Sequence, residues 1–126
     1  MRRETGDATD RERLDHMLRA ARDAIAIAAG RARADVDTDL ALQHALAHCV
    51  LLIGEAAARV TDAGRARAPL LPWPRVVGMR HILVHAYFKL DYDAVWRVVT
   101  EHLPGMVAAL EQTLSEWPES PPPASA

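Results

Sequence analysis

Apolar side chains return every three or four residues along most of this 126-residue chain, which is the period of an α-helix. The β-branched alternation and the Asn-Gly or Asp-Gly signals of a hairpin protein are absent, and alanine is abundant throughout. A chain of this length is too short for two ordinary domains. We therefore predict a single all-α domain, an antiparallel bundle of four to five helices.

Local start and stop signals divide the chain into these helices. The predicted starts, in chain order, are Thr9 with Glu12 in capping-box spacing, Thr38 or Asp39, Pro74, and Asp91 or Asp93. Gly30 lies near the end of the first helix, and the polar residues 31–37 are expected to link it to the second. Pro104 either starts a further short helix or kinks the fourth. The bundle is expected to span residues 9–117, between a flexible N-terminus (1–8) and a disordered Pro-rich tail (118–126).

The most apolar stretch, residues 40–58, is interrupted by glutamine, histidine and glutamate, and is expected to form a buried helix rather than a membrane span. The lone Cys49 lies within it and is expected to be a small buried hydrophobe in a reducing compartment. The N-terminal residues carry Arg2 and Arg3 without the apolar stretch of a secretory signal. These features predict a cytoplasmic protein that does not enter a membrane.

Charge is distributed unevenly along the chain. The formal net charge is −2, which argues against a generally basic nucleic-acid coat. Residues 59–90 nevertheless carry six basic residues against one acidic residue, whereas residues 91–126 carry one against six. The middle third is therefore the part that could meet an anion.

Residues 75–96 concentrate the groups that can do chemistry, with four of the six aromatic residues and two of the six histidines. On a helix, Arg80 and Tyr87 are seven residues apart and point nearly the same way, and His81 and His85 lie four apart on the adjoining arc. An arginine, two imidazoles and a phenol can thus converge on one groove.

This set suits cleavage of an RNA phosphodiester without a metal ion. A histidine can accept the proton of a 2′-hydroxyl or donate one to the leaving 5′-oxygen, and a guanidinium can hold two phosphate oxygens while charge builds. Because one chain supplies few such groups, a two-fold dimer that places two copies of the helix across a cleft would complete the site. The spacing alone also fits a solvated helix face with a surface ion pair.

Other residues leave alternatives open. His44 and His48 form a second pair four residues apart, which could join His81 and His85 in a metal site or simply pack in the core or a cleft. Glu55 interrupts an apolar stripe, either as a structural partner of a buried arginine or as a cleft residue that orients Arg80. His16 and His102 are expected at the surface or boundary, and the three tryptophans, Trp73, Trp96 and Trp117, in packing or a dimer interface.

The sequence Arg80-x4-His85-x-Tyr87 resembles the Arg-x4-His-x-Tyr motif of HEPN-domain toxins similar to HepT. The resemblance covers about residues 10–116 and includes three further pieces, Ile53-Gly54-Glu55-Ala56-Ala57, Trp73-Pro74-Arg75-Val76-Val77-Gly78-Met79-Arg80, and Val84-His85-Ala86-Tyr87-Phe88 with Asp91 and Trp96 following. His81 departs mildly from the family, which usually has another polar residue there, often asparagine.

The resemblance implies a HEPN-like bundle that dimerises and places its motif residues in the cleft between protomers. Such proteins are toxins, commonly metal-independent endoribonucleases without a cofactor, and their partner is a small nucleotidyltransferase antitoxin that transfers AMP to the motif tyrosine, here Tyr87. It assigns phosphate binding to Arg80, acid–base chemistry to His85, and auxiliary or substrate-binding roles to His81, Arg75 and Glu55. The alternative is a non-catalytic module that binds nucleotide or RNA, or docks on its partner.

Overall fold

The computed structural model describes residues 6–84 and 91–118, and these residues form helices without any strand. In chain order the elements are α1 (Gly6–Ala28), α2 (Arg33–Thr38), α3 (Leu40–Arg59), α4 (Asp62–Ala66), α5 (Trp73–Val84), α6 (Tyr92–Arg97), a π-helical turn η1 (Val98–His102) and α7 (Leu103–Ser115). The predicted all-α architecture is confirmed.

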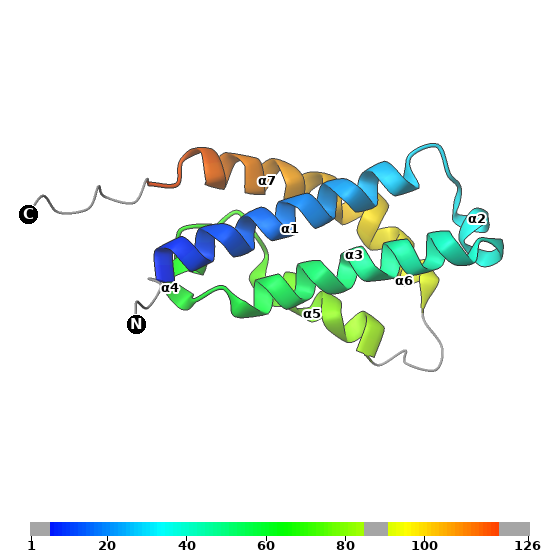
Figure 1. Cartoon of the computed structure of the whole chain (residues 1–126), viewed down its shortest axis with the longest axis horizontal. Coiled ribbons are helices and arrows are strands. Elements are labelled where there is room, and N and C mark those ends of the chain that lie inside the picture. The colour runs from blue at the N-terminus through cyan, green and yellow to red at the C-terminus, as the bar shows by residue number, and fades with distance from the viewer. Residues whose placement is uncertain (1–5, 85–90, 119–126) are drawn as a thin grey trace, which may run out of the picture.

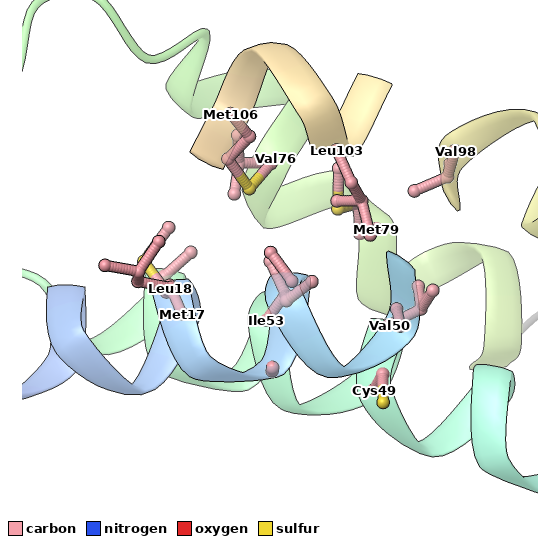
Figure 2. Close-up of a cluster of buried hydrophobic side chains, with 14 of the residues drawn as sticks. Met17, Leu18, Cys49, Val50, Ile53, Val76, Met79, Val98, Leu103 and Met106 are labelled. Carbon is pink, nitrogen blue, oxygen red and sulfur yellow. The ribbon is translucent and has the colours of Figure 1, made fainter. Parts of the chain in front are cut away.

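The two longest helices, α1 and α3, run antiparallel side by side (Figure 1). Helix α7 packs against α1, and α5 packs against α3. Figure 2 shows how the four helices meet, with Met17 and Leu18 from α1, Val50 and Ile53 from α3, Val76 and Met79 from α5, and Leu103 and Met106 from α7. Each fully buried leucine, isoleucine or methionine here contributes about 1.5–3 kcal/mol relative to exposure, so this shared core holds the bundle together.

Side-chain caps set several helix starts where the sequence places them. Asp39 accepts a hydrogen bond from the Leu42 backbone N–H (3.0 Å) and caps α3, and Asp91 accepts one from the Ala94 N–H (3.1 Å) and caps α6. Gly30 follows the end of α1 with a φ of 75°, a conformation that glycine adopts without the usual steric cost. The predicted starts of these two helices and the stop near Gly30 are confirmed.

The start of α1 differs from the prediction, because the helix begins at Gly6 rather than at Thr9. Asp10, expected in the first turn, instead lies further inside the helix, where its side chain is fully buried and accepts hydrogen bonds from the Thr61 backbone N–H (2.9 Å) and hydroxyl (2.5 Å). Asp10 therefore lies inside the first helix and ties it to the start of α4. The rest of residues 1–8, and most of the predicted tail, lie outside the described residues.

Short local elements complete the connections. The link predicted at residues 31–37 contains α2, which buries Val36, and a further short helix, α4, follows Thr61. Before Pro104 the chain makes the π-helical turn η1, and Pro104 then lies in the first turn of α7. Because proline has no N–H to donate, the regular helical ladder cannot run through this position, which accounts for the irregular turn.

Helix α3 is long and apolar enough, by length and composition, to cross a membrane, although the sequence predicted that it would fall short. It passes because histidine and glutamine interrupt it without adding charge. This is weak evidence for a membrane span, since the core helix of a water-soluble protein passes the same test. In this structure α3 lies between α1 and α5 and contributes the core residues Leu46, Val50 and Ile53.

Candidate functional site

Arg80, the first residue of the predicted motif, lies on α5 and pairs with Glu55 of α3. The Arg80 Nε and the Glu55 Oε1 are 3.8 Å apart, and the two side chains are 40% and 44% exposed. An ion pair this open to solvent stabilises a fold by about 0–1 kcal/mol. The pair therefore leaves much of the Arg80 guanidinium accessible to solvent.

Gly54 sets the position of the Arg80 backbone. A Cβ atom on Gly54 would lie 2.8 Å from the Arg80 backbone nitrogen and 3.0 Å from its Cβ, which is closer than real Cβ contacts allow. Helices α3 and α5 therefore approach each other at this pair because residue 54 has no side chain. Two neighbouring residues of α3 thus contact the same arginine, since Gly54 lies against the Arg80 backbone and Glu55 pairs with its guanidinium.

Trp73, about two turns before Arg80, holds the start of α5 against the core. Its indole N–H donates a hydrogen bond to the Ala68 carbonyl (3.0 Å), and the Arg65 guanidinium lies 5.4 Å from the ring centroid. Val76 and Met79 follow on the buried face of α5. This packing confirms the core role predicted for Trp73 and leaves Arg80 on a half-exposed face.

The structure separates Arg75 from the Arg80–Glu55 pair. Arg75 is exposed and lines a hollow with Arg97 of α6 and His102 of η1, whereas Glu55 lies on α3. The five residues between Arg75 and Arg80 correspond to about 140° of helix rotation, so the two side chains leave α5 in different directions. Arg75 and Arg80 therefore lie on different faces of α5. His81 is exposed on α5 beside Arg80.

His85 and Tyr87 lie outside the described residues, immediately beyond the last described residue of α5. Their predicted roles remain predictions.

His44 and His48 are both exposed on α3, so the interpretation that they pack in the core is wrong. They occupy the face of the helix turned away from Leu46, Val50 and Ile53. In the ranges 6–84 and 91–118 no group of three histidine, cysteine, aspartate or glutamate side chains could hold a metal ion.

Three smaller predictions are confirmed. Cys49 is buried, and burial, with a smaller contribution from the negative charge of Asp23, raises the pKa of its thiol above the usual value. His16 is exposed and His102 is partly buried, as expected for surface and boundary residues. Trp117 is buried and packs its ring against the Arg67 guanidinium, 5.2 Å from the centroid.

The role of Gly54 could not be recognised from its own sequence neighbourhood. The resemblance includes Gly54 only as part of a matching segment. A glycine within a helix usually lowers helix stability, and the sequence does not show what offsets that cost here. The helix–helix geometry shows what it does. In retrospect, Gly54 can be recognised as a small residue that directly precedes Glu55, the glutamate facing α5.

Comparison with known proteins gives the family. A family profile described as ribonuclease HepT-like matches residues 17–113, which include α3, Glu55 and the whole Arg-x4-His-x-Tyr segment. This chain belongs to the HepT-like ribonuclease family.

Individual relatives agree with that placement. The chain is 34% identical over 70 residues to "Putative RNase MJ1380" of Methanocaldococcus jannaschii, 27% identical over 108 residues to "Putative RNase TTE0752" of Caldanaerobacter subterraneus subsp. tengcongensis, and 31% identical over 74 residues to "Probable ribonuclease HepT" of Thermococcus cleftensis. These matches cover 56%, 86% and 59% of this chain, and 64%, 96% and 67% of the respective relatives. No solved structure matches.

Proposed function

We propose that this protein is a metal-independent endoribonuclease, the toxin of a toxin–antitoxin pair. The observation that carries the proposal is Arg80: Gly54 and Glu55 hold it half-exposed on α5, at the first position of the Arg-x4-His-x-Tyr motif. Membership of the HepT-like ribonuclease family supports the same reaction. An arginine held by one carboxylate and open to solvent is suited to binding a phosphate.

In the proposed reaction the RNA 2′-oxygen attacks the adjacent phosphorus while the bond from phosphorus to the 5′-oxygen breaks. One histidine accepts the proton of the 2′-hydroxyl, and an acid returns a proton to the leaving 5′-oxygen, giving a cyclic phosphate and a free 5′-hydroxyl. His85 is assigned to this proton chemistry. Arg80 stabilises the extra negative charge on the phosphate oxygens in the transition state.

The two proton transfers favour a homodimer as the active unit. One chain offers a single His85, and a two-fold axis next to α5 would bring a second His85 into the same cleft. One copy would then act as the base and the other as the acid. Measurement of the solution mass of the wild-type protein tests the dimer.

Control by a nucleotidyltransferase antitoxin is the second part of the proposal. The Tyr87 oxygen would attack the α-phosphorus of ATP, so that AMP is transferred and pyrophosphate leaves. The new phosphodiester brings bulk and negative charge next to the arginine that the RNA phosphate needs. Intact mass of the protein after incubation with its partner and ATP, compared with Tyr87→Phe, tests this modification.

Cleavage of total cellular RNA and tRNA in the presence of a chelator tests the ribonuclease activity. The wild type, shown by intact mass to be unmodified, is compared with His85→Ala and Arg80→Gln. Cleavage by the wild type alone supports the proposal. If none of the three proteins cuts RNA, the alternative of a module that binds nucleotide or RNA, or docks on its partner, replaces it.

A further inference from the structure

An open groove runs between α1 and α3, next to the Glu55–Arg80 pair of the candidate site. Its volume is about 460 Å³. On α1, the residues Arg13, His16, Arg19 and Asp23 line it at intervals of three or four, which places them along one ridge of the helix. The antiparallel course of α1 and α3 (Figure 1) makes the opposite rim from the later part of α3.

The rims of this groove carry arginines that the fold does not use. Within residues 6–84 and 91–118, Arg13 and Arg59 make no hydrogen bond or ion pair, and both lie on the groove. Arg19 pairs with Asp15 at 3.0 Å, but its side chain is 72% exposed. With the exposed His16, these side chains form a cluster that can bind phosphates, since exposed arginines cost little to redirect.

The floor of the groove is apolar. Leu52 of α3 is 44% exposed there, although it is a large hydrophobic residue, and Ala20 and Ala56 flank it. Basic rims above an apolar floor fit a ligand with regularly spaced negative charges and flat apolar faces. Single-stranded RNA has both, whereas an RNA duplex keeps its bases stacked inside and offers mainly its backbone.

Glu55 connects this groove to the candidate site. It lines the groove and also pairs with Arg80 at 3.8 Å. A strand lying along the groove would therefore reach Glu55, the residue that pairs with the arginine assigned to the scissile phosphate. The groove also carries two carboxylates: Asp23 on α1 would repel phosphates at its own position, whereas the charge of Glu55 is partly offset by Arg80.

We propose that the groove between α1 and α3 binds the single-stranded part of the RNA substrate that flanks the cleaved bond. Arg13, Arg19 and Arg59 contact backbone phosphates, and Leu52 contacts a base. This inference rests on the proposed ribonuclease function and adds to it the kind of RNA that is bound and the surface that binds it.

The test measures binding of a fluorescent single-stranded 2′-O-methyl oligoribonucleotide of mixed sequence, which cannot be cut because it lacks the attacking hydroxyl. The full-length wild type is compared with Arg13→Gln/Arg19→Gln. The matched control is Arg11→Gln/Arg22→Gln, which removes two arginines from the same helix on the side facing α7, where Arg11 bonds the Leu114 carbonyl and Arg22 bonds Glu111.

The groove variant is expected to bind roughly 10- to 30-fold more weakly near 0.1 M salt, and its plot of log K against log salt to lose about 1.4 units of slope, because each phosphate contact on a single strand contributes about 0.7. The control is expected to bind like the wild type. Arg13→Lys/Arg19→Lys is expected to retain most of the affinity, since lysine keeps the positive charge and also binds phosphate, as a point charge.

Three results would overturn the proposal. The first is equal loss of affinity in the groove and control variants, and the second is unchanged binding by Arg13→Gln/Arg19→Gln. The third is a change of the groove variant's solution mass, which would make the groove a contact between two copies of the chain. Circular dichroism and thermal melting of each variant establish that it is folded.

A parallel cleavage assay separates this inference from the proposed function. If the wild type cuts unmodified RNA and the groove variant binds and cuts equally well, the groove proposal fails and the ribonuclease proposal stands. If the wild type binds the oligonucleotide through the groove but cuts no RNA, the ribonuclease proposal fails instead. Leu52→Asp, on the groove floor, is expected to reduce binding in the same direction as the arginine variant.

Discussion

Two glycines in this protein lie at close contacts between helices, one beside the candidate site and the other in the core. At Gly54 on α3, an added Cβ would meet the backbone of Arg80 on α5, and at Gly64 on α4 it would collide with the carboxylate of Asp10 on α1. Both glycines allow a charged residue from another helix to come very close. Their environments then differ: Asp10 is fully buried with two hydrogen bonds from Thr61, whereas Arg80 is 40% exposed and pairs with Glu55 at 3.8 Å.

The difference shows how close packing can serve either stability or function. A buried carboxylate with short hydrogen bonds has its bonding capacity used by the fold, so its removal costs folding free energy. A half-exposed guanidinium in a long ion pair adds little to the free energy of unfolding, and its N–H groups stay available to donate hydrogen bonds to a ligand. We therefore expect the Asp10 junction to determine stability and the Arg80 junction to determine activity, and the following variants test that division.

Arg80→Gln is expected to give the largest effect. It removes a charge that the proposed reaction needs in the transition state, so kcat/KM for RNA cleavage should fall about 10²- to 10³-fold. The thermal midpoint should stay within about 1 °C of the wild type, because the exposed pair with Glu55 is worth little. Cleavage kinetics and thermal unfolding of the same preparation check both statements, and a large loss of stability would contradict the division.

Asp10→Ala is expected to show the reverse pattern. It removes the carboxylate that accepts two hydrogen bonds from Thr61. The free energy of unfolding should therefore fall by about 2–3 kcal/mol in urea titrations. Activity per folded molecule should not change. A variant that loses cleavage while remaining as stable as the wild type would show that Asp10 acts on the site.

The contrast between these junctions also explains what could be predicted from sequence. Asp39 and Asp91 cap their helices through contacts three residues away, so local reasoning found both starts. The start of α1 was predicted three residues too late, and the contact of Asp10 with Thr61, 51 residues along the chain, was not predicted. Capping preferences contain no information about a partner at that distance.

The residues of the candidate site also divide into those that local sequence indicates and those that depend on how the helices pack. Arg80 was predicted from its place in the Arg-x4-His-x-Tyr motif, and Glu55 because it interrupts an apolar stripe. Gly54 and the groove arginines were not predicted, because their significance depends on which faces of α1, α3 and α5 meet. The assignment of His44 to the core failed for that reason too, since a helix that is apolar nearly all round does not reveal which side lacks a neighbour.

Gly54→Ala and Gly64→Ala form a matched pair of intermediate effect. Both add a methyl group where there is no room, and both should lower the free energy of unfolding by about 1–3 kcal/mol. Only Gly54→Ala should also lower cleavage, by roughly tenfold or more, because it displaces the Arg80 backbone. Stability and kcat/KM measured for each variant check this, and equal activity losses in both would mean that the two junctions are not separate in function.

Glu55→Gln is expected to give the smallest effect and to be the sharpest test of what the ion pair does. The amide keeps the shape of the side chain but loses the charge that holds the Arg80 guanidinium, so stability should change by less than about 1 kcal/mol. If Glu55 orients Arg80, KM for RNA should change little while kcat falls severalfold, because a less ordered guanidinium binds phosphate but stabilises the transition state less well. If the carboxylate instead competes with RNA for Arg80, KM should fall and kcat should not. Steady-state kinetics with Glu55→Gln, and with Glu55→Asp as the variant that keeps the charge, distinguish a positioning residue from an electrostatic competitor.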